Sequence, residues 1–579
     1  MNWESFESSL AFMLIAMPAF GALLTCAATW TGNESVRMTV LINTLLTLFV
    51  SVVIVISYDV PESHTATKTL TQNKPSDSGP QLIQFESHLR WLGQRRITIV
   101  EKEDDGATTK RSIQRIHGPN IQFAFGIDGI NLWFILLCNL LVVVCVLANW
   151  RTEGASPAAF FAWILLLQAG VNGALAALDI VVFYLFLEWT ILPVTFLLGL
   201  FGGEGRRTMA KRYVAFQLVG SLFVFLGLMG IVVAYSMMRS SGGTVPRSNF
   251  SIQQLTEMIP QWTAASENAL EYWQFLGPWL LLALLIGFGI KSCIIPFHAW
   301  FRTSVETSAR VPAILLSAIV VKLGLYGIIR FLIPLFAEFL LQLQPLLTPL
   351  LVCTALIASL RLFTDDSTRK LVASLTIIDL NIAILAAISM NAIGVIGAIL
   401  LAVAHGIAIA LLQLIIVENS SGEQIEGTVP TTSKWLSIPY FVAILTLMGI
   451  PLLAIFPARW MTLLGIFNYA PGIGPSSISF ILLAMLCPTL VCIALARRLW
   501  NPPDEAFKPR LENKQTTTAI VILVVVILAC GLFPQALIRR IEPSVAHALE
   551  PYDDYVDKLM ESSESSSRQG DEPSHSSGL

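Results

Sequence analysis

Residues 281–301 read LLALLIGFGIKSCIIPFHAWF, an apolar run with a lysine at position 291 and a proline at position 296. A run of about 18 or more apolar residues predicts a membrane-spanning helix. Lys291 lies inside this run, where a charge costs roughly 2.5 to 3.5 kcal/mol on insertion scales, so it requires a partner, a hydrated cavity or a function. Pro296 removes a backbone donor and predicts a break in the helix.

Five further ionisable residues lie in apolar runs of the same kind. They are Glu188, Lys322, Asp379, His405 and Arg459. Because charged side chains at membrane depth are costly, the six together predict a charge or proton path inside the membrane. The structural alternative is a set of static buried salt bridges that fix the helix register.

The composition is typical of a polytopic membrane protein. Hydrophobic residues make up 55% of the chain and charged residues 13%, whereas soluble domains are roughly a quarter charged; the mean hydropathy is +0.69. The net charge is −3 and the cations are scattered among loops, so no basic nucleic-acid-binding face is expected. All eight cysteines lie in apolar runs without a CxxC motif. We interpret them as small buried hydrophobes and expect no haem, iron–sulfur or other metal site.

Apolar windows of about 19 residues predict roughly fourteen spans. Their centres lie near residues 20, 46, 138, 167, 190, 222, 284, 322, 350, 380, 405, 446, 485 and 528. With both termini outside, the inner loops hold most cations, such as Arg206 and Arg369, and the short outer loops hold little beyond Arg239 and Arg247. This distribution follows the positive-inside rule.

Two of these spans, five spans apart, contain helix breaks. Pro296 interrupts the seventh span, and Pro451 with Pro457 interrupts the twelfth in GIPLLAIFPARW, residues 449–460. A lone proline more often only kinks a helix. Paired breaks are typical of inverted repeats whose broken helices hold an ion path, so we predict two inverted five-helix repeats, spans four to eight and nine to thirteen.

The chain divides into four predicted segments. Residues 1–57 form two N-terminal transmembrane helices, and residues 121–540 form the transmembrane core. Residues 58–120 are a polar insert on the outer face, where alternating residues around Asp105-Gly106 predict a β-hairpin. Residues 541–579 are predicted to be a polar, disordered C-terminal tail, since no apolar periodicity follows Glu561.

Five motifs of the core occur in the order and spacing of a known family. They are FAFGIDGINLWFILL (123–137), YLFLEWTILPVTFL (184–197), GIKSCIIPFHAWF (289–301), VVKLGLYGIIRF (320–331) and AVAHGIAIALL (402–412). In these motifs the chain resembles the antiporter-like, proton-translocating membrane subunits of respiratory complex I, the NADH:quinone oxidoreductase, of the subunit M or chain 4 type.

The resemblance implies an all-α, non-redox membrane-arm subunit that couples quinone reduction elsewhere in the complex to proton movement. No catalytic chemistry and no cofactor are expected in this chain; NADH, FMN, iron–sulfur clusters and quinone are expected in partner subunits. The implied partners are other membrane-arm subunits, especially sister antiporter-like subunits, within the lipid bilayer. The implied location is an energy-coupling membrane such as the bacterial inner membrane.

The matching motifs also assign roles to residues. The resemblance implies proton translocation through Glu188, Lys291, Lys322 and His405, with His298 just beyond the break. It further implies that Glu188 and Lys291 meet, so that movement of the carboxylate changes the proton affinity of the lysine. His405 alone is explained equally well by packing.

Three features depart from this family. Arg459 stands where subunit M carries a glutamate, and Asp379 where the tenth span commonly has a histidine. The loop FRTSVETSARVPA, residues 301–313, lacks the family's Pro-Asp and Ala-Pro-Thr elements. Arginine does not release its proton in proteins, so we expect Arg459 to be a fixed charge on the proton path that requires a carboxylate or a hydrated cavity nearby. Asp379 is either the partner of such a buried cation or a substitute proton relay.

Two other functions remain open. One is a subunit of a multi-subunit cation/proton antiporter, which the cation at position 459 favours. The other is a degenerate paralogue that serves as a structural spacer, which the altered loop permits. The partner subunits would distinguish these alternatives.

Overall fold

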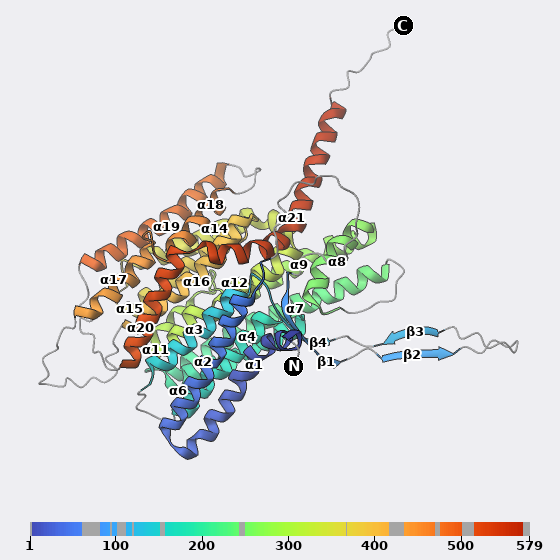
Figure 1. Ribbon diagram of the computed structural model, residues 1–579. Helices are drawn as coiled ribbons and strands as arrows, with labels where there is room; N and C mark the ends of the chain where they lie inside the picture. The colour runs from blue at the N-terminus through green and yellow to red at the C-terminus, as the bar shows by residue number, and fades with distance from the viewer. Residues whose placement is uncertain are drawn as a thin grey trace, which may run out of the picture.

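The computed structural model describes residues 3–60, 82–92, 95–100, 112–117, 121–150, 157–241, 249–365, 367–415, 434–468, 475–500 and 514–570. These residues form a bundle of apolar helices with four short strands beside it (Figure 1). Eleven helical segments of the described chain are long and apolar enough to cross a membrane. The protein is therefore an integral, multi-span membrane protein.

The first half of the chain contains the first break. In chain order they are α1 (Trp3–Ala27), α2 (Asn33–Ser57), α3 (Leu132–Ala148), α4 (Pro157–Ala176), α5 (Ile180–Trp189), α6 (Ile191–Phe201), α7 (Arg206–Ser241), α8 (Ile252–Ala265), α9 (Glu267–Lys291), α10 (Ala299–Thr307), α11 (Arg310–Leu315), α12 (Lys322–Gly327) and α13 (Ile333–Leu335). A short 3₁₀ turn, η1 (Ala28–Thr31), joins α1 to α2.

The second half contains the second break and ends in a long helix. Its helices are α14 (Ala337–Arg361), α15 (Thr368–Ala387), α16 (Ala392–Ile415), α17 (Lys434–Met448), α18 (Ile455–Phe467), α19 (Pro475–Trp500), α20 (Lys514–Leu532) and α21 (Gln535–Gly570).

The eleven candidate spans coincide with eleven of the fourteen predicted ones. The predicted third span is the shorter helix α3, the twelfth is divided between α17 and α18, and the thirteenth is α19. The predicted all-α polytopic class is confirmed, while the count of fourteen and the two inverted repeats stay predictions.

Both predicted helix breaks are confirmed. In the seventh span α9 ends at Lys291 and α10 begins at Ala299. In the twelfth span α17 ends at Met448 and α18 begins at Ile455. Gly449 has a φ of 78°, a left-handed conformation that ends helices and suits glycine because it lacks a Cβ.

The centre of the bundle is formed by the eighth and eleventh spans. The most apolar windows of Arg310–Leu335 and Ala392–Ile415 are completely buried, whereas the window of Asn33–Ser57 is 33% buried. Two π-helical turns, η2 (Leu316–Val320) and η3 (Ile328–Leu332), flank Lys322 in the eighth span. Such turns leave the regular helical hydrogen-bond pattern and often occur at functional sites.

The strands belong to the insert and to the chain just after it. β1 (Gln84–Leu92) pairs antiparallel with β4 (Ile121–Ile127). β2 (Arg95–Val100) pairs antiparallel with β3 (Ser112–His117), which corresponds to the predicted hairpin. Residues 61–81, 93–94, 101–111 and 118–120 of the insert, including the Asp-Gly turn, lie outside the described residues.

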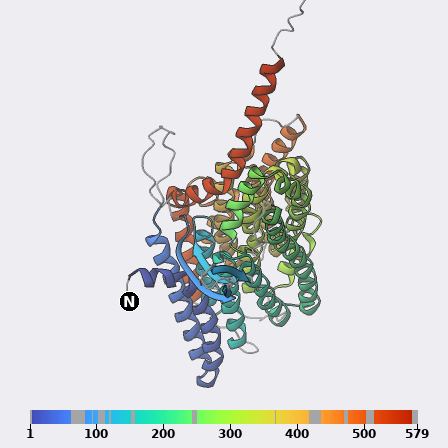
Figure 2. The same ribbon diagram turned by 90° about the vertical axis from the view of Figure 1, so that its right-hand side faces the viewer.

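The expectation of a disordered tail from residue 541 is wrong for most of that segment, because α21 continues to Gly570. Its first part packs against the bundle and its last part projects away from it (Figures 1 and 2). Ile541, Val545 and Leu549 are buried at spacings of four residues, a helical period that two prolines and many polar residues obscure in the sequence. Residues 571–579 lie outside the described residues.

The connecting segments gather at two ends of the bundle. One end, the insert face, brings together residues near Ile83, α8, Pro334 and α21 around one cavity. At the other end, the Asp365 face, Asp365 contacts residues from α10, α15 and α19. In a fourteen-span count the segments of the insert face follow spans 2, 6, 8 and 14, and those of the Asp365 face follow spans 7, 9 and 13. Segments after even-numbered spans thus lie at one end and segments after odd-numbered spans at the other, as expected for a chain that crosses the membrane at every span. Arg247, one of the two cations predicted for the short outer loops, lies outside the described residues.

Candidate functional site

Lys291 ends α9 at the first break and is buried against α7. Its Nζ donates to Oε1 of Gln217 at 3.4 Å and to Oγ of Ser221 at 3.1 Å. The residue is 5% exposed, so these two neutral acceptors replace water around its ammonium group. Neutral acceptors stabilise a charged lysine less than a carboxylate does.

Glu188 does not form the direct contact with Lys291 that the resemblance implied. No ion pair within 4.0 Å joins the two described side chains, although the carboxylate interacts electrostatically with Lys291 and with Tyr213. Oε1 of Glu188 is buried and has no hydrogen-bond partner. The donors of Lys291 are directed to α7 instead, so the two charges are coupled through space.

Several buried polar atoms near the first break lack partners. Besides Oε1 of Glu188, they are the hydroxyls of Tyr213 and Ser292, Nε2 of Gln217 and Nδ1 of His298. Buried polar groups without partners cost about 1 to 3 kcal/mol each, and proteins normally satisfy such groups with ordered water. Buried polar atoms without a protein partner are thus concentrated near the first break.

His298 precedes α10, beyond the break. Nδ1 of His298 is buried and has no hydrogen-bond partner. A neutral imidazole can accept a proton at one ring nitrogen while it donates at the other. The position thus suits a proton acceptor between the break and the Asp365 face.

Lys322 lies between the two π-helical turns and contacts His405. Its Nζ donates to the carbonyl oxygen of Ser317 at 2.9 Å and lies 3.5 Å from Nδ1 of His405. Lys322 is 3% exposed and His405 is 2% exposed. Nε2 of His405 has no hydrogen-bond partner, so the imidazole contacts Lys322 on one side and has a free ring nitrogen on the other.

Arg459 and Asp379 form a buried ion pair beside the second break. Nη2 of Arg459 donates to Oδ1 of Asp379 at 2.9 Å, which confirms the predicted pairing. Nη1 of Arg459 donates to the carbonyl oxygens of Leu447 and Met448, each at 3.1 Å. These carbonyls end α17, so the guanidinium satisfies backbone acceptors that the break leaves free and neutralises the helix C-terminus.

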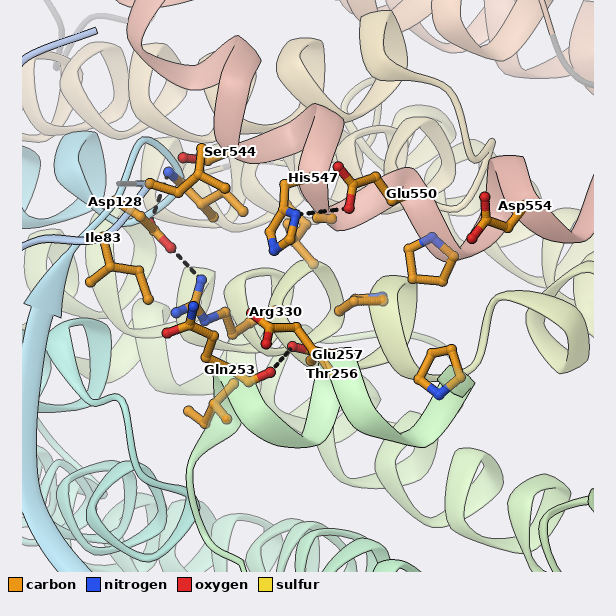
Figure 3. Close-up of a pocket in the computed structure, with 18 of the residues that line it drawn as sticks. Ile83, Asp128, Gln253, Thr256, Glu257, Arg330, Ser544, His547, Glu550 and Asp554 are labelled. Atoms are coloured by element: carbon orange, nitrogen blue, oxygen red, sulfur yellow. Dashed lines mark hydrogen bonds and ion pairs between the residues drawn. The ribbon is translucent and has the colours of Figure 1, made fainter. Parts of the chain in front are cut away.

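Asp128 caps the backbone at the start of α3 and also pairs with a cation. Its Oδ1 accepts from the backbone N–H groups of Ile130 and Asn131 at 3.0 and 2.9 Å, at the start of α3. Its Oδ2 pairs with Nη1 of Arg330. This pair borders a cavity of about 220 Å³ on the insert face. Figure 3 shows Arg330 directed at Asp128, with His547 and Glu550 of α21 on another side of the cavity.

The described residues contain no cluster of side chains that could bind a metal ion. Among these residues no group of three or more His, Cys, Asp and Glu side chains gathers, and no cysteine forms a disulfide. Cys26 and Cys353 are exposed, so the expectation that all cysteines are buried is wrong for these two. Their positions lie on outer faces of α1 and α14, where an apolar thiol is tolerated against lipid.

Sequence reasoning missed three residues that complete these contacts. Gln217 and Ser221 are four residues apart on α7, so they share one face, and this spacing was the available signal. Arg330 is a cation eight residues after Lys322 in the same apolar run. Its position met the criterion that identified the other six ionisable residues.

The chain matches proteins of known families over most of its length. The model of the family described as NADH:quinone oxidoreductase/Mrp antiporter, TM, matches residues 177–483, more than half of the chain. NADH-quinone oxidoreductase subunit M of Rickettsia prowazekii is 26% identical over 489 residues, which cover 83% of this chain and 94% of the relative.

Two solved structures share the fold. A chain in respiratory complex I from Thermus thermophilus with bound NADH has a TM-score of 0.68 at 21% identity, over 94% of this chain and 99% of that chain. A chain in the Mrp complex from Dietzia sp. has a TM-score of 0.67 at 17% identity, over 94% of this chain and 52% of that chain. By the family match, the chain belongs to the NADH:quinone oxidoreductase/Mrp antiporter transmembrane family.

Proposed function

We propose that this chain is a proton-translocating membrane-arm subunit of an NADH:quinone oxidoreductase complex. The observation that carries the proposal is the contact of Lys322 with His405, at 3.5 Å, inside the two completely buried central spans. A lysine and a histidine kept at membrane depth are costly. They are side chains whose proton affinities burial can bring into the physiological range.

The geometry supports a stepwise transfer. A proton held by Lys322 can pass to Nδ1 of His405, and the imidazole can release its other proton from Nε2. Oδ2 of Asp379, which has no hydrogen-bond partner, is a candidate acceptor near the second break. Arg459 keeps its own proton and serves as a fixed charge that holds Asp379 in place.

The first half supplies protons to this centre. Lys291 holds a proton while its ammonium group donates hydrogen bonds to neutral acceptors. Glu188 controls the release of this proton through electrostatic coupling. Protonation of Glu188 removes a negative charge and favours loss of the proton from Lys291. This mechanism requires no redox group in the chain, so NADH, FMN, iron–sulfur clusters and quinone belong to partner subunits.

The setting follows from the same proposal. The chain would lie beside sister antiporter-like subunits in an energy-coupling membrane, the inner membrane in bacteria. The insert face, with the 58–120 segment and both termini, would be the outer side. The cation-rich Asp365 face, with Arg302, Arg369 and Arg498, would be the inner side.

The test uses sealed inverted membrane vesicles that contain the whole complex. NADH should drive proton uptake, and Lys322→Ala and His405→Leu should each reduce proton uptake per NADH oxidised. Co-purification of NADH- and quinone-module subunits with the chain should accompany this result. Wild-type uptake in Lys322→Ala would disprove the role of the central pair.

A second candidate function is that of a subunit of a multi-subunit cation/proton antiporter. The permanent cation Arg459 beside the second break favours it, because a fixed charge suits gating of a metal cation as well as of a proton. Sodium-dependent proton exchange without NADH, together with small antiporter subunits as partners, would identify this function. A degenerate spacer would show neither activity, and its buried ionisable residues would tolerate replacement.

A further inference from the structure

A buried polar cluster on the Asp365 face joins the chain beyond the first break to α15. Nη2 of Arg302, in α10, pairs with Oδ1 of Asp365, and Nη1 donates to Oγ of Ser374 at 2.9 Å. Oγ of Ser374 in turn donates to Oδ2 of Asp365 at 2.8 Å. The side chain of Asp365 is 1% exposed and that of Arg302 is 21% exposed. We call Arg302, Asp365 and Ser374 the inner latch.

Further bonds fix the same two segments together. Nη1 of Arg369 donates to the carbonyl oxygen of Glu306 at 2.9 Å, and Lys370 pairs with the Glu306 carboxylate at 3.3 Å. Arg498, at the end of α19, donates to the carbonyl oxygen of Asp365. Three helices therefore meet at Asp365, α10 and α15 at its buried carboxylate and α19 at its carbonyl oxygen, which is more than a solvated surface pair requires.

The latch lies between the two candidate proton sites along the chain. α10 continues α9 beyond the break that follows Lys291. α15 carries Ser374 and also Asp379, the partner of Arg459. Ser374 and Asp379 are five positions apart, about 7.5 Å along a helix axis. The latch and the second ion pair therefore share one helix, α15.

One latch residue, Arg302, and the neighbouring Glu306 belong to the loop that departs from the family motifs. Arg302 and Glu306 lie in FRTSVETSARVPA, residues 301–313. The planar guanidinium fork of Arg302 donates to the Asp365 carboxylate and to the Ser374 hydroxyl at once.

We propose that Arg302 is a positioning residue for proton transfer, which couples the segment after Lys291 to the Asp379–Arg459 pair through Asp365 and Ser374. This inference rests on the proposed function, because it concerns the efficiency of the same transfer. Loss of the latch would let α10 move independently of α15, so a proton released at the first break would less often reach the second half.

The experiment measures protons taken up per NADH oxidised, in sealed inverted vesicles with the complete complex. We expect Arg302→Gln to lower this ratio by about twofold or more, in the range by which coupling residues act. Arg302→Lys should restore part of the ratio, since it keeps the charge and one bond to Asp365. Arg212→Gln, at an exposed position in α7, is the matched control and should give the wild-type ratio.

Two outcomes would overturn the inference. A wild-type ratio in Arg302→Gln, while Lys291→Ala fails to pump, would leave the proposed function intact and reject the latch. If Arg302→Gln does not assemble, Ser374→Ala decides, because it keeps the ion pair and removes only the bridging hydroxyl; a wild-type ratio there rejects the latch. Full pumping by Lys291→Ala would instead reject the proposed function itself.

Discussion

Nη2 of Arg459 lies 2.9 Å from Oδ1 of Asp379, and the two side chains are only 7% and 4% exposed. An arginine that merely extended to the membrane surface would expose its guanidinium, so that explanation is excluded by the burial. Oδ2 of Asp379 has no hydrogen-bond partner. The pair therefore combines a fixed positive charge with a carboxylate oxygen that is available to a proton.

Replacement of Arg459 should separate its structural and functional roles. We expect Arg459→Ala to impair assembly, since breaking a buried ion pair by removing one partner costs about 3 to 5 kcal/mol. Arg459→Lys should assemble and pump at least as well as the wild type, because lysine keeps the charge and can also release a proton. The measurements are the amount of the chain in the purified complex and NADH-driven proton uptake.

A double variant controls for the cost of the unpaired charge. Arg459→Met combined with Asp379→Leu should recover assembly, because apolar residues of similar volume often replace a buried pair without loss of stability. It should not recover proton uptake. Assembly and uptake like the wild type in Arg459→Ala would show that the pair is dispensable.

Lys291 should release a proton during turnover. We expect Lys291→Ala to abolish pumping and to depress NADH oxidation where the two are tightly coupled, since the path loses its first proton store. Lys291→Arg keeps the charge but cannot release its proton, so pumping should also be impaired. Lys211→Ala, at an exposed position, is the control. Full pumping by the arginine variant would contradict a role in proton release.

The sequence predicted the features that depend on local chemistry. The two breaks were predicted from Pro296 and from Pro451 with Pro457, because proline lacks a backbone N–H donor and can interrupt a helix. The burial of Lys322, His405 and other ionisable residues followed from their positions in apolar runs. These inferences need no knowledge of which helices become neighbours.

The contacts between helices were harder to predict from the sequence. The acceptors of Lys291 are neutral residues of α7, and neutral polar residues do not stand out in an apolar helix. The pairing of Asp128 with Arg330 joins residues 202 positions apart, so only the packed bundle reveals it. The helical period of α21 was hidden by Pro543 and Pro551.

His405 should act in transfer and not only in packing. We expect His405→Leu to retain assembly, because leucine fills the apolar surroundings, and to lower proton uptake strongly, because Lys322 loses its neighbouring acceptor. His405→Gln keeps a polar atom near Lys322 but cannot carry a proton between two ring nitrogens, so it should pump as poorly. Wild-type uptake in both variants, with normal amounts of complex, would favour packing.

Stability should depend on pH through Asp179, which caps the start of α5. Burial raises the pKa of Asp179 from 3.8 to about 6, against hydrogen bonds from Val181, Gln122 and Val182 that lower it. The folded state therefore binds a proton more tightly than the unfolded state. The contribution of Asp179 to stability is fully present below pH 3.8 and is lost as the pH rises through about 6.

Asp179→Asn should remove this dependence while it keeps the cap, because asparagine also caps helices. Above pH 6 the variant should be more stable than the wild type, by up to about 3 kcal/mol for a shift of two pKa units. Thermal unfolding of the purified protein in detergent between pH 4.5 and 7.5 measures both effects. Asp59→Asn, at an exposed position, should keep the wild-type profile; an unchanged profile in Asp179→Asn would contradict the assignment.

Gly324 should be intolerant of any side chain, because α12 approaches the end of α9 at this residue. A Cβ there would lie 2.8 Å from the carbonyl oxygen of Phe288 and in closer contact with the hydroxyl of Ser292. The hydroxyl can rotate away, but the Phe288 carbonyl belongs to the backbone, so Gly324→Ala must move α12 and, with it, Lys322. We expect the free energy of unfolding to fall by about 1 to 3 kcal/mol, and proton uptake per NADH to fall as well.

The position of the clash makes this prediction specific. Adding Ser292→Ala to Gly324→Ala should not restore stability or pumping, since the contact with the Phe288 backbone remains. Gly203→Ala is the matched control, because its Cβ would meet only the Thr307 carbonyl oxygen at an ordinary 3.4 Å. The result that would contradict this prediction is a wild-type free energy of unfolding and wild-type proton uptake in Gly324→Ala. In that case α12 is not held close to α9, and the position of Lys322 relative to the first break does not limit proton transfer.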